Sequence, residues 1–152
     1  MAGPVETFRG VVRSEQCDHF GHMNVQFYDG AMSDGFFHLL TLIGLDPATV
    51  ESRRLGLAAI GMTLNYRREL RVGDLYKVET GFMDLTPGHI VTGHRMTRLT
   101  DGKLALTAWS RGVPLDLELR RKTTLPDDIF SRAADFVCAP ADLDLDPEVL
   151  AA

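Results

Sequence analysis

The sequence predicts an α+β fold in which one long helix covers an antiparallel sheet within a single domain. Residues 25 to 43 carry apolar side chains at the spacing i, i+3, i+4, i+8, which is typical of a helix. After residue 55, strand-like segments follow one another through short turns, so neighbouring strands run antiparallel. The 152 residues suit one domain, and we find no internal repeat or linker. A helix with one apolar face must bury that face against the sheet.

The first part of the chain predicts a strand, a loop and the long helix. Residues 5 to 13 have strand character, and residues 14 to 24 are polar and contain a glycine. Asn24 is a candidate N-cap for a helix that runs from Val25 to about Ile43. Gly44 ends this helix.

Two glycines inside the predicted helix need a reason. Gly30 and Gly35 each cost about 1 kcal/mol of helix stability relative to alanine. Close packing of the helix against a sheet would explain both.

The rest of the domain predicts four strands and a short helix. The strands are placed at residues 57–68, 75–85, 90–99 and 104–119, with turns at 72–74, 86–89 and 101–102. Pro114 predicts a bend or an edge in the last strand. Residues 47–54 form a possibly helical link, and Pro126 starts a helix to about Val137. We therefore expect a domain over residues 1–138 and an acidic tail over 139–152 that is loose or lies on the surface.

Composition narrows the class of protein. The net charge of −5 disfavours a nucleic-acid partner, and no apolar run approaches the roughly 20 residues of a membrane span. Residues 1–13 lack a signal-peptide pattern, and Cys17 and Cys138 make no disulfide framework, so we expect a cytoplasmic protein. His38, His89 and His94 show no metal-ligand spacing, so no metal site is predicted.

The segment with the clearest chemistry is Asp18-His19-Phe20-Gly21-His22-Met23-Asn24-Val25. It places a carboxylate and a tight turn directly before the long helix. The N–H groups of a first helical turn have no partner within the helix and carry partial positive charge. They can bind the negative oxygen of a tetrahedral intermediate while the carboxylate acts as base or nucleophile.

The pattern Asp18-x-x-Gly21-His22-x-Asn24-x-x-x-Tyr28 resembles the active-site segment of hotdog-fold thioesterases of the 4-hydroxybenzoyl-CoA thioesterase type. The run Asn65-Tyr66-Arg67-Arg68-Glu69-Leu70-Arg71-Val72-Gly73-Asp74 resembles the family's second landmark. Val113-Pro114-Leu115-Asp116-Leu117 with Leu125-Pro126 is a weaker match. The likeness covers about residues 5 to 130.

This resemblance implies a long central helix wrapped by a curved antiparallel sheet of about five strands. It also implies that two protomers pair their sheets edge to edge, with the acyl-CoA site at their interface. The expected assembly is a homodimer, or a dimer of dimers that makes a homotetramer. The expected activity is acyl-CoA thioester hydrolysis without a bound cofactor.

The resemblance also assigns catalytic roles. Asp18 attacks the thioester carbonyl or activates the attacking water, and the backbone N–H of Val25 is the oxyanion donor. Asn24 orients the carboxylate or the water, caps the helix, or does both. His22 is a candidate acid or base, but a structural histidine that fixes the turn is the favoured reading, since the family uses one carboxylate.

Four residues are candidates for substrate binding: Tyr28, Tyr66, Arg67 and Arg68. Tyr28 lies one turn after Asn24 and is expected to pack under the sheet rather than to touch substrate. Strand alternation would put Arg67 and Arg68 on opposite faces, so only one could reach the CoA phosphates; a solvated charged face is the alternative. Apolar side chains from the helix and the sheet are candidates to line the acyl group, although most of them are expected to be core residues: Phe27, Met32, Phe36, Leu57, Ile60 and Met62.

Two other functions compete with hydrolysis. A hotdog-fold hydratase or dehydratase acting on acyl thioesters would need a separate acid and base, and His22 alone is a weak case for it. A non-catalytic acyl-CoA-binding protein would not need a carboxylate at position 18. The sequence does not predict the acyl group, the pathway, or coenzyme A against a carrier protein.

Overall fold

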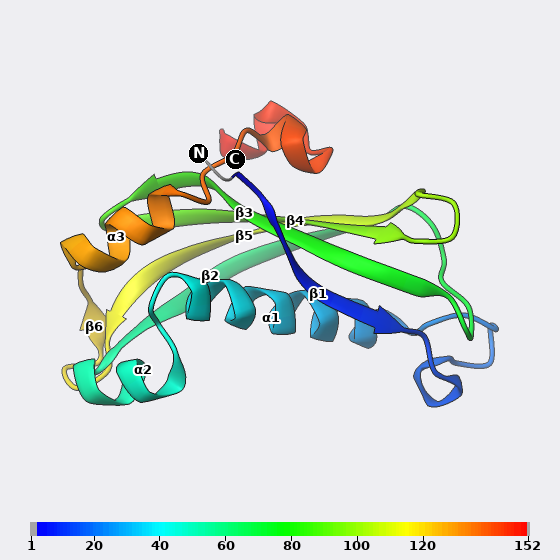
Figure 1. Ribbon diagram of the computed structural model, residues 1–152, viewed down its shortest axis with the longest axis horizontal. Helices are drawn as coiled ribbons and strands as arrows, with labels where there is room; N and C mark the ends of the chain where they lie inside the picture. Colours follow the sequence, from blue (N-terminus) through cyan, green and yellow to red (C-terminus); the bar gives the residue numbers. More distant parts are fainter. Residues whose placement is uncertain (1–2, 152) are drawn as a thin grey trace.

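In the computed structural model, which describes residues 3–151, one antiparallel sheet curves around a long helix (Figure 1). The strand order is β1-β3-β4-β5-β2, and a short strand β6 pairs with β5. The strands are β1 (Val5–Val11), β2 (Leu55–Tyr66), β3 (Leu75–Thr86), β4 (His89–Arg98), β5 (Leu104–Asp116) and β6 (Arg121–Lys122). The helices are α1 (Val25–Leu42), α2 (Pro47–Arg53) and α3 (Asp127–Ala134). The predicted α+β fold class is confirmed.

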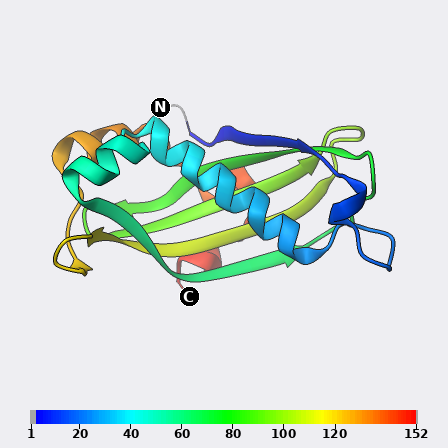
Figure 2. The same cartoon turned by 90° about the horizontal axis from the view of Figure 1, so that it is seen from below.

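Helix α1 begins and ends where its capping residues predict. The Asn24 side chain accepts the N–H of Gln26 at 3.1 Å, and Gly44 leaves the helix with a φ of +94°, a conformation that favours glycine. The buried residues share one face: Tyr28, Ala31, Met32, Gly35, Leu39 and Leu40. This face packs on β1 and β3, and Figure 2 shows α1 crossing the sheet obliquely between edge strands β1 and β2.

The structure explains one of the two helix glycines. A Cβ on Gly35 would lie 2.6 Å from Oγ1 of Thr7 on β1, so the helix approaches the sheet too closely for a larger residue. A Cβ on Gly30 would meet nothing within 4 Å. Close packing therefore accounts for Gly35, and the same explanation is wrong for Gly30.

Strand β2 ends earlier than the sequence predicts. It stops at Tyr66, and the N–H groups of Arg67 and Arg68 then both donate to the carbonyl of Ala105, at 2.8 and 3.1 Å. Two successive donors on one acceptor break the alternation of a strand. The expectation that Arg67 and Arg68 lie on opposite strand faces is wrong for this reason.

The last long strand also stops short of its predicted end. The Asp116 carboxylate accepts the N–H groups of Glu118 and Leu119, both at 2.9 Å, and this turn ends β5. The chain then returns as β6. At this end of the sheet, the last residue pair between β4 and β5 is Ile90 with Gly112. Pro114 lies beyond that pair, where β4 no longer bonds to β5.

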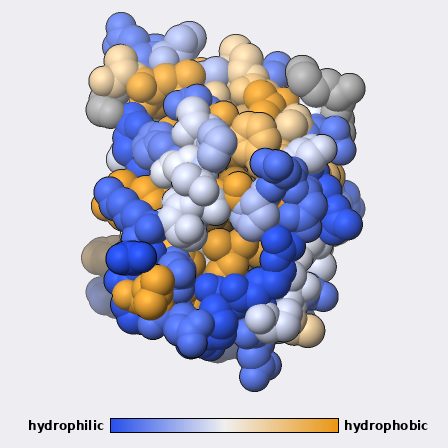
Figure 3. Space-filling model, turned by 90° about the vertical axis from the view of Figure 1, so that its left-hand side faces the viewer, coloured by the Kyte–Doolittle hydropathy of each residue, from blue (hydrophilic) through white to orange (hydrophobic). Residues whose placement is uncertain are grey.

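Figure 3 looks onto the end of the molecule that carries α2, α3 and β6, where hydrophobic residues show between hydrophilic ones.

The acidic tail lies on the sheet face opposite α1 (Figure 1). Its apolar residues Leu143, Leu145 and Val149 are buried in a cluster with Met83 and Val91. Of the two expectations for this tail, a position on the surface agrees with these contacts. The inner sheet face holds α1 and the outer face holds the tail, so the central strands are covered on both sides.

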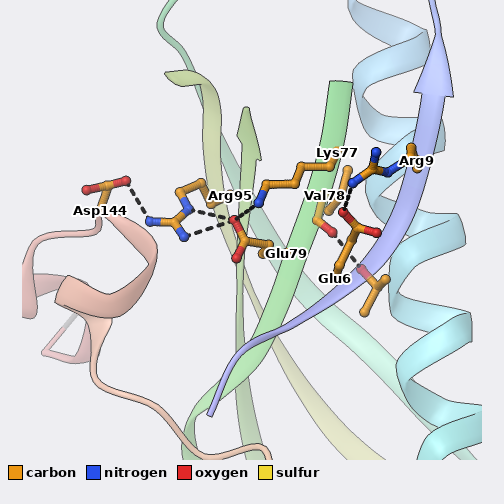
Figure 4. A network of polar contacts seen from close by, with 8 residues as sticks. Glu6, Arg9, Lys77, Val78, Glu79, Arg95 and Asp144 are labelled. Atoms are coloured by element: carbon orange, nitrogen blue, oxygen red, sulfur yellow. Dashed lines mark hydrogen bonds and ion pairs between the residues drawn. The ribbon is translucent and has the colours of Figure 1, made fainter. Parts of the chain in front are cut away.

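Ion pairs fasten the tail to the sheet. Arg95 on β4 contacts Asp144 at 3.0 Å and Glu79 on β3 at 2.9 Å, and Lys77 lies 3.6 Å from Glu79 (Figure 4). No helix among residues 3–151 is long and apolar enough to cross a membrane.

Candidate active site

The loop before α1 is held rigidly by backbone hydrogen bonds. The N–H of Asp18 donates to the His22 carbonyl at 3.2 Å, and the N–H of Gly21 donates to the Asp18 carbonyl at 3.0 Å. Gly21 has a φ of +91°, which favours glycine at this turn. Farther along, the N–H of Met23 donates to the carbonyl of Leu70 at 2.7 Å. These bonds fix where the Asp18 side chain can lie.

The Asp18 carboxylate accepts one hydrogen bond on each oxygen. Oδ2 accepts from the side-chain amide of Asn24, and Oδ1 accepts from the N–H of Phe20, both at 2.9 Å. The Asn24 amide, followed by the Phe20 N–H, lowers the pKa of Asp18 below its ordinary value. The side chain is only partly buried, so an ionised oxygen with a spare lone pair stands near the surface.

Asn24 makes both contacts that the sequence left as alternatives. Its Nδ2 donates to Asp18, and its Oδ1 accepts the N–H of Gln26 in the first turn of α1. One amide therefore ties the carboxylate to the start of the helix. The N–H of Val25, the first residue of α1, has no acceptor within residues 3–151. A partly positive donor thus lies one residue after the amide that holds Asp18.

A shallow cleft of about 260 Å³ lies beside this helix end. It is lined by His22, Met23, Val25, Tyr28, Tyr66, Arg67, Arg68 and Glu69. Six of the eight predicted site residues are in this set. The other two, Asp18 and Asn24, do not line the cleft but adjoin it through the loop and the helix start.

His22 and Tyr28 connect the cleft walls. His22 Nε2 lies 3.1 Å from Oε2 of Glu69. The Tyr28 hydroxyl accepts the N–H of Leu70 at 3.1 Å and donates to the carbonyl of Arg68 at 3.4 Å. Burial raises the pKa of Tyr28, so its hydroxyl stays protonated. Tyr28 therefore ties the segment after β2 to α1, and His22 ties the same segment to the loop before α1.

The two arginines differ in how free they are. Arg68 Nη1 donates to the carbonyl of Leu104 at 3.3 Å. The exposed guanidinium of Arg67 makes no hydrogen bond or ion pair within the described part of the chain, residues 3–151. Tyr66, half exposed at the end of β2, packs edge-on against Tyr28 with ring centroids 5.4 Å apart. Arg67 is therefore the cation in this cleft with the greatest freedom to meet a ligand.

A second, deeper groove of about 270 Å³ lies between α1 and the strands β4, β5 and β2. Its helix side is formed by Asp29, Ser33, Phe36 and Phe37, and its sheet side by Leu57, Ala58, Ala59, Met62, Ile90, Thr92, His94, Ser110 and Gly112. The volume is near the lower end for small-molecule sites.

Comparison with known proteins identifies the family. The profile of the Thioesterase-like superfamily matches residues 12–133, most of the chain. This protein belongs to the Thioesterase-like superfamily. The matched region contains the Asp18 loop, α1, the sheet strands from β2 onward and α3.

Solved structures support the same fold for this superfamily member. SAV2348 from Staphylococcus aureus, solved in complex with CoA, has 23% identity and a TM-score of 0.82, covering 90% of this chain and 86% of that one. Slr0204 from Synechocystis, a 1,4-dihydroxy-2-naphthoyl-CoA thioesterase, has 15% identity and a TM-score of 0.76, covering 88% and 97%. YbaW from Escherichia coli, a probable thioesterase, has 16% identity and a TM-score of 0.71, covering 86% and 97%. The helix wrapped by a curved sheet is the hotdog fold.

The apolar candidates for an acyl lining fall in different places in this thioesterase-like protein. Phe36, Leu57 and Met62 line the groove. Met32 is fully buried in the core, and neither Phe27 nor Ile60 borders the groove. Met32 therefore stabilises the fold rather than presenting a surface to a ligand.

Sequence reasoning missed the polar residues of the groove, chiefly Thr92, His94 and Ser110. The alternation of β4 carries a usable signal, because Thr92 and His94 share a face with Ile90. No sequence pattern marks that face as the wall of a groove.

Within residues 3–151, no three His, Cys, Asp or Glu side chains lie close enough to hold a metal ion.

Proposed function

We propose that this protein is an acyl-CoA thioesterase of the 4-hydroxybenzoyl-CoA thioesterase type, with Asp18 as nucleophile or general base. The observation that carries the proposal is the Asn24 side chain, which binds the Asp18 carboxylate at 2.9 Å and caps α1. It brings an ionised oxygen and the unpaired N–H of Val25 to one helix end. An anion and a donor for a developing oxyanion are what thioester hydrolysis requires.

Two routes use these groups. In one, Asp18 attacks the thioester carbonyl carbon, the C–S bond breaks, CoA leaves as the thiolate, and water hydrolyses the resulting anhydride. In the other, Asp18 takes a proton from a water molecule that attacks the same carbon, and the tetrahedral intermediate then breaks its C–S bond and releases CoA as the thiolate. In both routes the carbonyl oxygen becomes negative and accepts a hydrogen bond from the Val25 N–H.

Arg67 suits the phosphates of coenzyme A. Its guanidinium is exposed and unpaired within residues 3–151, and it shares a cleft with Val25. The CoA complex of SAV2348, a similar fold, supports a CoA ligand. The deeper groove beside α1 would then hold the acyl group. Both cysteines, Cys17 and Cys138, are free, which supports the predicted cytoplasmic setting.

We further propose a homodimer, or a dimer of dimers, formed through strand β2. Among residues 3–151 this strand pairs with β5 alone, so its other edge has unpaired backbone groups. Five successive residues, 59–63, are exposed, including Ile60 at 58% and Met62 at 41%. A second copy pairing along this edge would cover these side chains and close the groove on its open side.

Sedimentation tests the assembly. We expect wild type to sediment with two or four times the chain mass of 16.8 kDa. In Ile60→Glu, the measured mass should shift toward that of a single chain. Val72→Glu is the matched control, because Val72 is equally exposed but lies outside β2. A monomeric wild type, or equal behaviour of the two variants, contradicts the proposed interface.

Thiol release from short, branched, aromatic and long acyl-CoA thioesters tests the reaction. Asp18→Asn keeps the shape and removes the charge, and we expect kcat to fall by about 10²–10⁴-fold with the melting temperature retained. Asp84→Asn, at an exposed carboxylate on β3, is the control and should leave kcat unchanged. Full activity in Asp18→Asn would remove this residue from the mechanism, and loss of an enoyl-CoA signal without thiol release would favour a hydratase.

A further inference from the structure

The two strands that form the floor of the groove, β4 and β5, carry the acidic tail on their opposite face (Figure 1). Successive side chains of a strand point to opposite faces of a sheet. One set of alternate residues on these strands lines the groove: Ile90, Thr92, His94, Ser110 and Gly112. The residues between them lie against the tail: Val91, Gly93, Trp109 and Arg111. A single layer of backbone therefore separates the groove from the tail.

A pair of glycines makes room for the tail on this outer face. Gly93 on β4 pairs with Gly81 on β3. A Cβ on Gly93 would lie 2.8 Å from Cδ1 of Leu143, which is 0% exposed. A Cβ on Gly81 would lie 2.7 Å from Sγ of Cys138. Alanine at either position would therefore collide with the chain after α3. We call the contact of Leu143 with Gly93 the seat.

Polar contacts tie the tail to both floor strands. Asp144 follows Leu143 and pairs with Arg95 on β4 at 3.0 Å (Figure 4). Arg111 on β5 donates from Nη2 to the carbonyl of Val149 at 2.9 Å. The tail follows residues 12–133, the region that the superfamily profile matches, so this support is an addition to the matched fold.

We propose that Leu143 is a positioning residue for the groove, and that the tail limits the size of the acyl group by supporting the floor from behind. The inference rests on the proposed function, in which the groove holds the acyl group. A sheet with a packed layer on each face cannot shift without losing contacts on one of them, because protein interiors are close-packed. With the seat empty, β4 and β5 relax toward the vacated space. The groove then becomes deeper and admits larger acyl groups.

CoA thioesters of graded length test this role. We would measure kcat/KM for straight-chain thioesters from acetyl to dodecanoyl, and for phenyl-terminated thioesters from benzoyl to phenylbutanoyl. The size ratio is kcat/KM of the best substrate in a series divided by that of the member two methylenes longer. In Leu143→Ala we expect this ratio to fall by about tenfold, the lower end of what one methylene is worth in an apolar pocket. The kcat for acetyl-CoA should stay unchanged, because an acetyl group is too short to fill the groove.

Gly93→Ala tests the seat from the side of the sheet. Its Cβ displaces Leu143, so the size ratio should fall as in Leu143→Ala. The double variant Gly93→Ala/Leu143→Ala removes the collision and fills part of the void, so the ratio should return toward that of wild type.

Val78→Ala is the matched control. Val78 on β3 is also 0% exposed, but it neither lines the groove nor packs with the tail. This variant should lose stability and keep the size ratio. Four outcomes overturn the inference and leave thioester hydrolysis standing: a flat size profile in wild type, an unchanged ratio in either single variant, no recovery in the double variant, or an equal fall in Val78→Ala.

Two further measurements keep the inference separate from activity and from folding. If no thioester is hydrolysed, the proposed function fails, and the affinities of non-hydrolysable CoA thioethers of the same lengths give the size ratio instead. If Leu143→Ala does not fold, hydrogen exchange of wild type replaces it, because a tail that affects binding in the groove must itself respond to binding. The reporter is the Leu145 N–H, which donates to the carbonyl of Pro140 at 3.0 Å. The tightest-binding long thioether should slow its exchange relative to the acetyl thioether, and equal or faster exchange overturns the inference.

Discussion

The side-chain amide of Asn24 joins the Asp18 carboxylate to helix α1. Its Nδ2 lies 2.9 Å from Oδ2 of Asp18, while its Oδ1 accepts the N–H of Gln26 at 3.1 Å. The same side chain therefore caps the helix and holds the carboxylate; we call its contact with Asp18 the clamp. Substitutions at position 24 can separate the two tasks.

Asn24→Ser should keep the cap and lose the clamp. Serine caps helices about as well as asparagine, but its side chain is too short to reach Asp18. Without the amide donor, the pKa of Asp18 rises toward its ordinary value, so the acid limb of the pH–kcat/KM profile moves to higher pH. Asn24→Ala should show the same kinetic shift and lose about 1 kcal/mol of unfolding free energy as well. A wild-type pH profile in the serine variant would show that the clamp does not tune Asp18.

Arg67→Ala should weaken binding of coenzyme A thioesters without slowing chemistry. Loss of one exposed charge-assisted contact costs about 1 kcal/mol, so KM should rise roughly fivefold at constant kcat. Pantetheine thioesters lack the nucleotide phosphates, and their KM should not change. Arg9→Ala, at an exposed ion pair with Glu6 on β1, is the control. An equal rise in KM for both classes of thioester would mean that Arg67 shapes the cleft rather than binds phosphate.

The elements that local sequence determines were predictable, and the contacts between distant segments were not. The cap at Asn24 and the turn at Gly21 involve neighbours within a few residues, so the residue types predict them. The bond between His22 and Glu69 joins segments 47 residues apart, and nothing in either segment indicates the other. Only the folded chain shows why His22 is tied to the segment after β2.

The same limit explains why the strand faces of Arg67 and Arg68 were predicted wrongly and why the position of His94 in the groove was not predicted. The prediction for Arg67 assumed that β2 continued, but the carbonyl of Ala105 accepts two successive N–H groups and ends the strand pattern. The position of His94 depends on the register of β4 against β3, which places it opposite Thr80. Register is set by the whole sheet, and one strand's composition does not reveal it.

The two helix glycines make a matched pair for stability. Gly35→Ala should lower the unfolding free energy by about 1–3 kcal/mol, because its Cβ would lie 2.6 Å from Thr7 Oγ1. Gly30→Ala should raise it by roughly 0.5–1 kcal/mol, because that position is open and alanine favours the helix. Urea unfolding of both variants measures the difference. Equal effects of the same sign would contradict the close approach of α1 to β1.

Buried His94 should make the protein less stable in mild acid. Its pKa is about 4 in the folded chain, against an ordinary value of 6.5. Above pH 6.5 both states are neutral at this residue. Between pH 6.5 and 4 the unfolded chain takes up a proton that the folded chain refuses, so the unfolding free energy falls as pH falls. The full effect is roughly 3 kcal/mol.

Urea unfolding of wild type and His94→Phe between pH 7 and 4 isolates the loss of unfolding free energy that His94 causes. Carboxylates titrate alike in both proteins, so the difference in unfolding free energy reports on His94 alone. We expect wild type to lose stability relative to the variant as the pH drops below 6.5. A difference that stays constant over this range would mean that His94 takes a proton as readily in the folded chain as in the unfolded one. The ring would then be solvated rather than sealed beneath α1.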